Sequence, residues 1–227
     1  MKPHSLCLVL SEASSPAPEA YPPATTWLEI RWDKIGTPPT GWLEALRHSY
    51  DKVIYTLRHC GTLSDTARAH CYGAWIAQGV PFVDIDYQEP FLKELLDGWA
   101  VSPTRLILSR HIWEYSGDLN RLRAELRAML ALRPYICKLA VLCQSAEHAA
   151  ELLNLYREFR PPSTNTPPTD DTANLLIFAM GAVGGFTRLA APYLGAPYTY
   201  AAYSEGVAPG LLPASLMQEI FNVWNEE

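Results

Sequence analysis

A single lysine interrupts a long apolar stretch of this sequence. Lys138 is the only charged residue in Tyr135-Ile136-Cys137-Lys138-Leu139-Ala140-Val141-Leu142-Cys143. A strand this apolar is typical of a parallel sheet that is buried on both faces, where an amine without a partner is costly. Two interpretations follow. The lysine stem extends and carries the amine to water, or the amine stays inside because it takes part in chemistry.

Polar side chains also stand near the ends of other strand-like runs. Side chains alternate along a strand, so residues two apart share a face. The groups that share a face are Glu29, Arg31 and Asp33; Thr56 and Arg58; Asp84 and Asp86; and Ser109 and His111. Taken singly, each has a structural explanation. A strand-end histidine is commonly a hydrogen-bonded surface residue, and Glu29 with Arg31 could form a structural ion pair.

Taken together, these residues favour a catalytic site. In a parallel barrel the carboxyl ends of the strands carry the active site, while the interior is normally filled by Val, Ile and Leu. If the polar faces point inward, five ionisable side chains converge in one mouth: Glu29, Arg31, Arg58, His111 and Lys138.

The strand-like runs predict that barrel. Short β-rich runs recur along the chain, and their number matches the strands of a (β/α)8 TIM barrel. They are Leu6–Leu10, Thr26–Trp32, Lys52–Arg58, Pro81–Tyr87, Arg105–His111, Tyr135–Cys143, Leu175–Gly181 and Tyr198–Tyr203.

Helical patterns lie between most of these runs. Thr62 or Ser64 is the candidate N-cap of one helix and Ser145 that of a later one, and an acidic residue follows in each first turn. Strands that alternate with helices imply a parallel sheet with right-handed crossovers, and we expect residues 1–227 to form a single barrel domain. The expected helices are Thr62–Gln78, Glu89–Ala100, Gly117–Leu132, Ser145–Phe159 and Ser215–Trp224.

Two proline-rich connections break the alternation. Ser11–Thr25 holds too many prolines for a helix, so we expect the first crossover helix to be missing. Apolar barrel surface would then be exposed there, and a partner subunit in a homodimer would cover it. Arg160–Thr172 is expected to be a mobile loop on the N-terminal face of the barrel, away from the chemistry.

The composition excludes several classes of partner. A formal net charge of -6 argues against binding to nucleic acid or to an anionic membrane, and no apolar run approaches the roughly 18 residues of a membrane helix. The five cysteines are odd in number and not spaced for a metal, and the six histidines show no paired ligand spacing. We therefore expect a cytoplasmic protein without a bound metal.

The order and spacing of the motifs resemble those of the type I 3-dehydroquinate dehydratases of the shikimate pathway, across essentially the whole chain. The interval from His111 to Lys138 also resembles that of the family. The matching pieces are Leu28–Asp33, Tyr55–Arg58, Val83–Asp86, Ser109–His111, Lys138–Ala140, Met180–Gly181 followed by Thr187–Arg188, and Ala208–Gly210.

The resemblance implies a reaction on a small keto acid without a cofactor. Lys138 would attack the ketone of 3-dehydroquinate and form a Schiff base, which acidifies the neighbouring carbon. His111 would remove that proton as a general base and then protonate the departing hydroxyl, giving 3-dehydroshikimate and water. The amine must be neutral to attack, and burial beside Arg31 and Arg58 would favour the neutral form.

The resemblance also implies how the substrate binds. Glu29 and Arg58 would bind its hydroxyls, and Arg188 its carboxylate. Met180 would pack against the imine through its polarizable thioether, or would simply fill the core. We interpret the Gly-rich stretch from Gly181 to Gly185 as a tight turn that sets Arg188 in the mouth, because it lacks the following lysine of a phosphate-binding loop.

The sequence departs from the family pattern at two places. Thr62 stands where a glutamate normally orients the histidine, and Asp65 could replace it. In the lid, two polar substrate contacts become Val207 and Leu211, and each lost hydrogen bond costs about 1 to 3 kcal/mol. Arg188 would then hold the carboxylate alone, or with Ser204 or Glu205.

Two alternatives remain open at this point. The chain could be another imine-forming barrel enzyme, such as a class I aldolase that acts on a related keto acid. It could also be a barrel that has kept the pocket, lost turnover and serves as a ligand sensor, and the altered lid motivates this second alternative.

Overall fold

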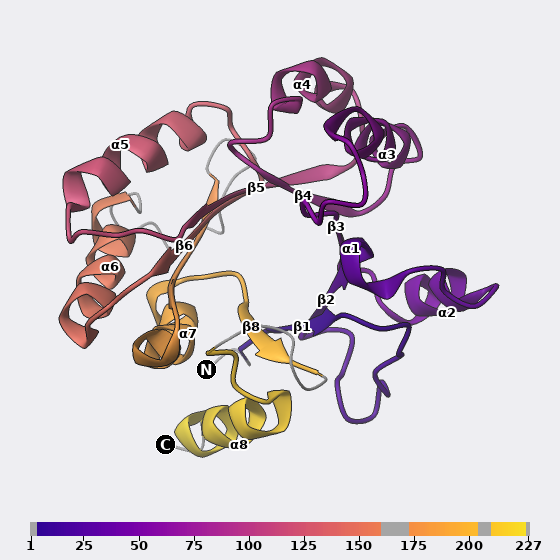
Figure 1. The fold of residues 1–227 in the computed structure, drawn as a ribbon. Coiled ribbons are helices and arrows are strands. Elements are labelled where there is room, and N and C mark those ends of the chain that lie inside the picture. The colour runs from indigo at the N-terminus through magenta and orange to yellow at the C-terminus, as the bar shows by residue number, and fades with distance from the viewer. Residues whose placement is uncertain (1–3, 160–172, 204–209, 226–227) are drawn as a thin grey trace.

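Eight parallel strands form a barrel with helices around it (Figure 1). The computed structural model describes residues 4–159, 173–203 and 210–225. The sheet runs in the order β7-β6-β5-β4-β3-β2-β1-β8, which confirms the predicted (β/α)8 fold. The strands are β1 (Leu6–Leu10), β2 (Thr26–Arg31), β3 (Val53–Thr56), β4 (Phe82–Asp86), β5 (Arg105–Ile112), β6 (Ile136–Leu142), β7 (Asn174–Met180) and β8 (Thr199–Ala202).

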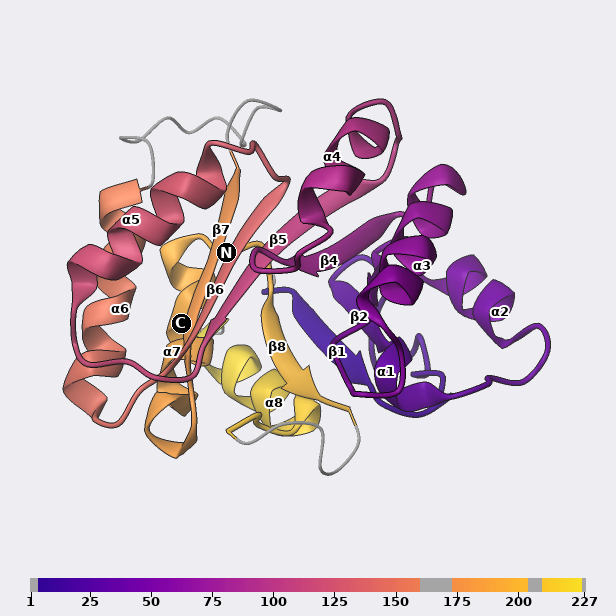
Figure 2. The same ribbon diagram turned by 45° about the horizontal axis from the view of Figure 1, so that its top comes forward.

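The barrel is nearly closed, with a seam between its first and last strands in sheet order. Among the described residues no ladder joins β7 to β8, and these two strands lie apart in Figure 2. Side chains bridge the seam instead. The rings of Phe178 in β7 and Tyr200 in β8 meet edge to face, with centroids 5.7 Å apart.

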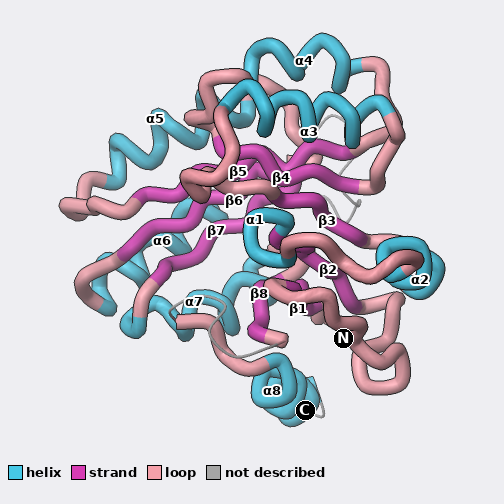
Figure 3. The backbone as a smooth tube through the Cα atoms, turned by 45° about the vertical axis from the view of Figure 1, so that its right-hand side comes forward, coloured by secondary structure: helices cyan, strands magenta, loops and turns pink. Residues whose placement is uncertain are grey.

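The helices lie on the outside of the strands, as Figure 3 shows. Ser64 accepts the backbone N–H of Ala67, so Ser64 and not Thr62 caps this helix. Ser145 accepts that of His148, as predicted. Within the described part of the chain, no helix combines the length and apolarity needed to cross a membrane. The helices are α1 (Trp32–Ile35), α2 (Trp42–Ser49), α3 (Asp65–Ala77), α4 (Leu92–Ala100), α5 (Leu119–Leu130), α6 (Ala146–Phe159), α7 (Gly185–Ala190) and α8 (Ala214–Asn225), with short 3-10 helices at Ala182–Gly184 and Ala191–Leu194.

The period-two alternation of the strands separates two cores. One set of side chains faces the helices and forms the larger core, with Leu8, Ile30, Leu139 and Ile177 among its members. The other set fills the barrel interior below the mouth. It includes Trp27, whose ring centroid lies 4.8 Å from that of Phe82 and 4.7 Å from that of Tyr198. This floor of packed rings leaves the carboxyl ends of the strands as the place where polar side chains can gather.

The first crossover has no helix, as its prolines predict. The loop between β1 and β2 packs against α2, a helix that the sequence reading did not identify. Trp42 donates its indole N–H to the Ser14 carbonyl, and the buried Tyr50 hydroxyl donates to the carbonyls of Pro16 and Tyr21. The chain therefore covers barrel surface here with its own residues, and the homodimer stays a prediction. Residues 160–172 lie outside the described residues.

We predict that Tyr50→Phe lowers the free energy of unfolding by about 1 kcal/mol, because a buried hydroxyl loses its carbonyl partners. Urea denaturation would measure the change. Tyr115→Phe is the matched control, because the buried Tyr115 hydroxyl has no hydrogen-bond partner in the described structure. Equal losses in the two variants would contradict the role given to Tyr50.

Candidate active site

The carboxyl ends of the strands enclose a pocket of about 520 Å³. Every residue that the sequence reading assigned to the site lines this pocket. They are Glu29, Arg31, Arg58, His111, Lys138, Met180 and Arg188. Strand alternation explains the convergence, because Glu29, Arg58, His111 and Lys138 all carry the inward parity of their strands.

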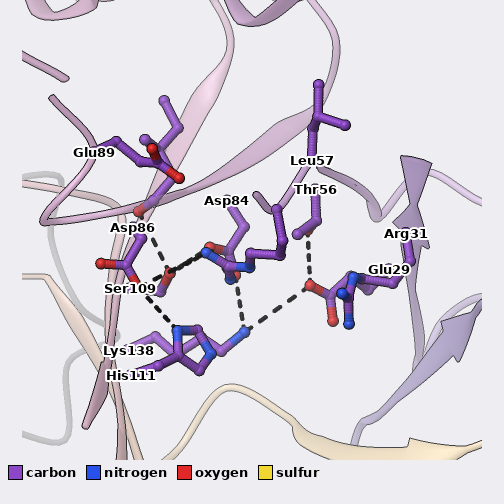
Figure 4. Close-up of polar contacts among 12 residues, drawn as sticks. Glu29, Arg31, Thr56, Leu57, Asp84, Asp86, Glu89, Ser109, His111 and Lys138 are labelled. Atoms are coloured by element: carbon purple, nitrogen blue, oxygen red, sulfur yellow. Dashed lines mark hydrogen bonds and ion pairs between the residues drawn. The ribbon is translucent and has the colours of Figure 1, made fainter. Parts of the chain in front are cut away.

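Lys138 keeps its amine inside the barrel. The residue is 3 % exposed, so the interpretation in which the stem carries the amine to water is wrong. Its Nζ donates to Asp84 Oδ2 at 2.8 Å and lies 4.0 Å from Glu29 Oε1 (Figure 4). It also donates to Tyr200 Oη at 2.8 Å. Among the described residues, the charged groups that lie within 4.0 Å of this amine are the carboxylates of Asp84 and Glu29, whereas the sequence analysis placed it beside Arg31 and Arg58.

Asp84 is the centre of the polar network. Besides Lys138, its carboxylate accepts from Arg58 Nη2 at 2.7 Å and from Ser109 Oγ at 2.5 Å, and Arg58 Nη1 donates to the same Ser109 hydroxyl. The side chain is fully buried. Burial alone would raise the pKa of Asp84, but the charges of Arg58 and Lys138 hold it below the usual range. Asp84 is therefore a buried carboxylate that two cations share.

His111 is oriented by Asp86, the next inward residue of β4. The distance from His111 Nδ1 to Asp86 Oδ2 is 3.0 Å. The ionised carboxylate can only accept, so Nδ1 carries the proton and Nε2 is left as a basic nitrogen. Burial, helped by the charge of Arg58, lowers the pKa of His111 to about 4, although the bond to Asp86 opposes this shift. The imidazole is neutral near pH 7.

The expectation that Asp65 orients His111 is wrong. Asp65 accepts from Arg68 at 2.7 Å, and Thr62 contacts the thiol of Cys60 at 2.8 Å. The carboxylate that serves the histidine comes from a neighbouring strand, whereas Asp65 lies at the start of α3.

Glu29 and Arg31 do not bond directly to each other. Arg31 donates from Nε and Nη2 to the carboxylate of Asp33, at 2.9 and 2.6 Å. Glu29 accepts from the Thr56 hydroxyl at 2.7 Å. Its carboxylate oxygens can accept further hydrogen bonds, so Glu29 is suited to receive a ligand hydroxyl beside Lys138.

Arg188 reaches the pocket from α7. The helix is tied to β7 by Thr187, whose hydroxyl accepts from the Ala179 N–H at 2.9 Å and donates to the Gly184 carbonyl at 2.6 Å. The Gly-rich stretch therefore forms a 3-10 turn leading into a short helix, rather than only a tight turn. At Gly184 a Cβ atom would lie 2.6 Å from the Ala179 Cβ, so this close approach requires glycine.

The Arg188 guanidinium is a buried cation whose charge is not balanced locally. The residue is 3 % exposed, and the guanidinium lies 4.2 Å from the Phe178 ring centre. In the described part of the chain no carboxylate pairs with it, and its Nε lacks a hydrogen-bond partner. Burial lowers the pKa of Arg188 to about 10, so it remains charged near pH 7. Such a group is suited to donate charge-assisted hydrogen bonds to an anionic ligand.

The apolar side chains of the pocket lie on the same side as this arginine, which contacts Phe178. Val9, Phe178, Met180 and Leu211 line this side, so the expected apolar lid residue Leu211 does lie at the site. Gly210 has a φ of 79° and approaches the Gly181 carbonyl so closely that a Cβ would lie 2.6 Å away. Val207, Ser204 and Glu205 lie outside the described residues.

The sequence analysis assigned no role in the site to three residues that the structure places there: Asp84, Asp86 and Tyr200. The sequence did indicate that Asp84 and Asp86 face inward, because they share one face of β4. The indication for Tyr200 was weaker, since Tyr198 and Tyr200 alternate along the last predicted strand. No cluster of three or more His, Cys, Asp or Glu side chains suited to a metal occurs in residues 4–159, 173–203 and 210–225.

Comparisons with known proteins agree with one another. A family model described as type I 3-dehydroquinase matches residues 22–227. The 3-dehydroquinate dehydratase of Thermococcus onnurineus is 25% identical over 200 residues, 86% of each chain. That of Dehalococcoides mccartyi (strain ATCC BAA-2266) is 24% identical over 234 residues, 100% of this chain and 99% of the relative. The crystal structure of the Geobacillus kaustophilus 3-dehydroquinate dehydratase superposes with a TM-score of 0.79, at 20% identity over 99% of this chain and 92% of that one, and shows the likeness of fold.

We predict that His111 stays neutral at pH 5.5, where an ordinary histidine is largely protonated. Imidazole nitrogen chemical shifts in a pH titration would give a midpoint near 4. In Asp86→Asn the midpoint would fall further, because the hydrogen bond that raises the pKa is weakened. A midpoint at or above the ordinary value would contradict the burial of this ring.

Proposed function

Because this chain belongs to the type I 3-dehydroquinase family, we propose that it dehydrates 3-dehydroquinate to 3-dehydroshikimate through an imine on Lys138. The observation that carries the proposal is the buried Lys138 amine, which shares one pocket with a neutral imidazole and a buried, unbalanced guanidinium. These three groups supply a nucleophile, a base and an anion receptor, and the substrate needs all three.

The first step is attack of the amine on the ketone. Lys138 attacks through the lone pair of its neutral amine. Once the protonated imine has formed, Asp84 lies beside a positively charged nitrogen. A fully buried carboxylate at 2.8 Å from the nitrogen is suited to stabilise that charge.

The second step is removal of a proton from the carbon next to the imine. The neutral His111 can accept it at Nε2, because Nδ1 is held by Asp86. The low pKa of His111, due to burial and Arg58, then makes the imidazolium a good acid toward the departing hydroxyl. One ring thus serves first as base and then as acid.

The distribution of polar groups supports this ligand. Glu29, Arg31 and Arg58 gather on one side of the pocket, where hydroxyls would be bound. Arg188 would bind the carboxylate from the other side. The apolar wall, with Met180 and Leu211, would contact the faces of the ring, and it leaves Arg188 as the main described receptor for the anion.

We predict that borohydride added with 3-dehydroquinate fixes a covalent adduct on Lys138, because reduction traps the imine. Peptide mass spectrometry would locate it. Lys138→Met would give no adduct and no turnover, whereas Lys93→Met, at an exposed position of α4, would behave as the wild type. Turnover by the wild-type protein without any adduct would refute the imine route.

The His111→Ala variant separates the two steps. It should still give the adduct but lose about 100-fold or more in kcat, the usual contribution of a general acid-base group.

The alternative functions predict other outcomes for the wild-type protein. An adduct from other ketones together with no enone product from 3-dehydroquinate would favour a class I aldolase. Ligand binding by calorimetry with no product would favour a sensor.

We predict that Arg188→Met raises KM for 3-dehydroquinate roughly 10- to 150-fold, because a charged hydrogen bond contributes about 1.5 to 3 kcal/mol. Steady-state kinetics would measure it. Arg121→Met, at an exposed position of α5, is the matched control. Trapping of a cyclic ketone that lacks a carboxylate should be equal in Arg188→Met and the wild type. An unchanged KM would place the carboxylate elsewhere.

A further inference from the structure

Tyr200 contacts the Lys138 amine directly. Its hydroxyl lies 2.8 Å from Lys138 Nζ, and the same amine lies 4.3 Å from the centre of its ring. The side chain is buried, projects from β8 into the pocket and packs across the seam against Phe178. A side chain that only filled this space would need no hydroxyl in contact with the Lys138 nitrogen.

The Tyr200 hydroxyl holds a proton that its neighbours leave available. The oxygen accepts from Lys138, so its own hydrogen points elsewhere. The only other described partner is the Tyr198 hydroxyl, at a long 3.4 Å. Burial raises the pKa of Tyr200 well above 10, so the group is a neutral phenol in the resting site.

Tyr200 and Asp84 together fix the direction of the amine. A neutral primary amine has two N–H bonds and one lone pair. The two acceptors at 2.8 Å, Asp84 Oδ2 and Tyr200 Oη, take the two N–H bonds and leave the lone pair in the remaining tetrahedral direction. Once the amine is neutral, its attacking electron pair therefore points in one fixed direction.

We propose that Tyr200 is a catalytic residue of imine formation and hydrolysis: its hydroxyl orients the Lys138 amine and donates the proton with which the carbinolamine oxygen leaves as water. The inference rests on the proposed imine function and adds a group to it. The carbinolamine oxygen and Nζ are bonded to the same carbon, so a phenol in contact with Nζ is within reach of that oxygen.

Imine formation passes through a neutral carbinolamine. The Nζ lone pair forms the C–N bond, the carbonyl π pair moves to oxygen, and one nitrogen proton is transferred to that oxygen, which gives the neutral carbinolamine. The C–O bond then breaks, Tyr200 supplies a proton to the departing oxygen, and the nitrogen lone pair forms the C=N bond. The products are a protonated imine, water and a phenolate. In the closing hydrolysis, water adds to the imine carbon and returns its proton to Tyr200.

Burial and the negative charges of Glu29 and Asp84 raise the pKa of Tyr200, so a phenolate needs positive charge nearby at the moment it forms. The protonated imine is created in hydrogen-bond contact with it, and the positive charge of Arg188 interacts favourably with a Tyr200 anion. His111 does not supply this proton, because the neutral ring carries its hydrogen on Nδ1, where Asp86 holds it, and Nε2 has none to donate.

Tyr200→Phe tests the proposal, because it removes one oxygen and keeps the ring. In a rapid-quench experiment with 3-dehydroquinate and borohydride, the variant should form the Lys138 adduct about 100-fold more slowly than the wild type, the lower range for a general acid. Tyr115→Phe, which alters a buried tyrosine outside the pocket, should form it at the wild-type rate.

A second readout separates chemistry from a merely structural role. With substrate deuterated at the carbon next to the ketone, slow imine formation in Tyr200→Phe should suppress the isotope effect on kcat toward 1. An adduct formed at the wild-type rate, with an unchanged isotope effect, would overturn the role of Tyr200 while the imine route stands. Absence of an adduct in the wild type would instead defeat the proposed function, and this inference with it.

The wild-type protein provides a test that does not depend on the folding of a variant. Adduct formation in a single turnover should be slower in heavy water, because the phenolic proton moves in the step. Equal rates in light and heavy water would overturn the proposal.

Discussion

The site depends on one buried carboxylate. Asp84 is fully enclosed by the barrel and is bonded at once by Lys138 of β6, Ser109 of β5 and Arg58, which follows β3. A lone charge in that position would be very costly, so the carboxylate and its cations stabilise each other and fix each other's positions. Because Lys138 is held in this way, its amine can remain inside a hydrophobic strand, close to the imidazole of His111.

The pocket has two unlike sides, and the order of the strands explains the difference. Strands β2 to β6 contribute the acids, arginines, lysine and histidine, which neutralise one another. Strands β7, β8 and β1 contribute Met180, Phe178, Tyr200 and Val9, and the apolar Leu211 follows. Arg188 stands among this second group, so its charge has no local partner in the described structure. A ligand with hydroxyls on one side and a carboxylate on the other complements this arrangement.

The seam between β7 and β8 has a functional consequence. Where a ladder is absent among the described residues, side chains join the two strands, and Tyr200 is one of them. The ring that helps to close the barrel also places its hydroxyl on the Lys138 nitrogen. The same side chain thus packs across the seam and hydrogen-bonds to the Lys138 amine.

The sequence by itself determined which residues face the pocket, because the two-residue period of a strand needs no knowledge of the fold. That period, with the polar pairs at the strand ends, was enough to assemble Glu29, Arg58, His111 and Lys138 in one mouth. It also predicted the (β/α)8 order and the missing first helix. It did not reveal α2, whose short apolar pattern around Trp42 and Leu46 lies beyond a proline-bounded turn.

Only the tertiary structure decided which of these residues are partners. Lys138 is bonded to Asp84 two strands away, and His111 to Asp86 rather than to Asp65. Such pairings depend on the register between strands and on the path of the side chains across the interior. Local periodicity carries no information about either, because both are set by the closure of the whole barrel.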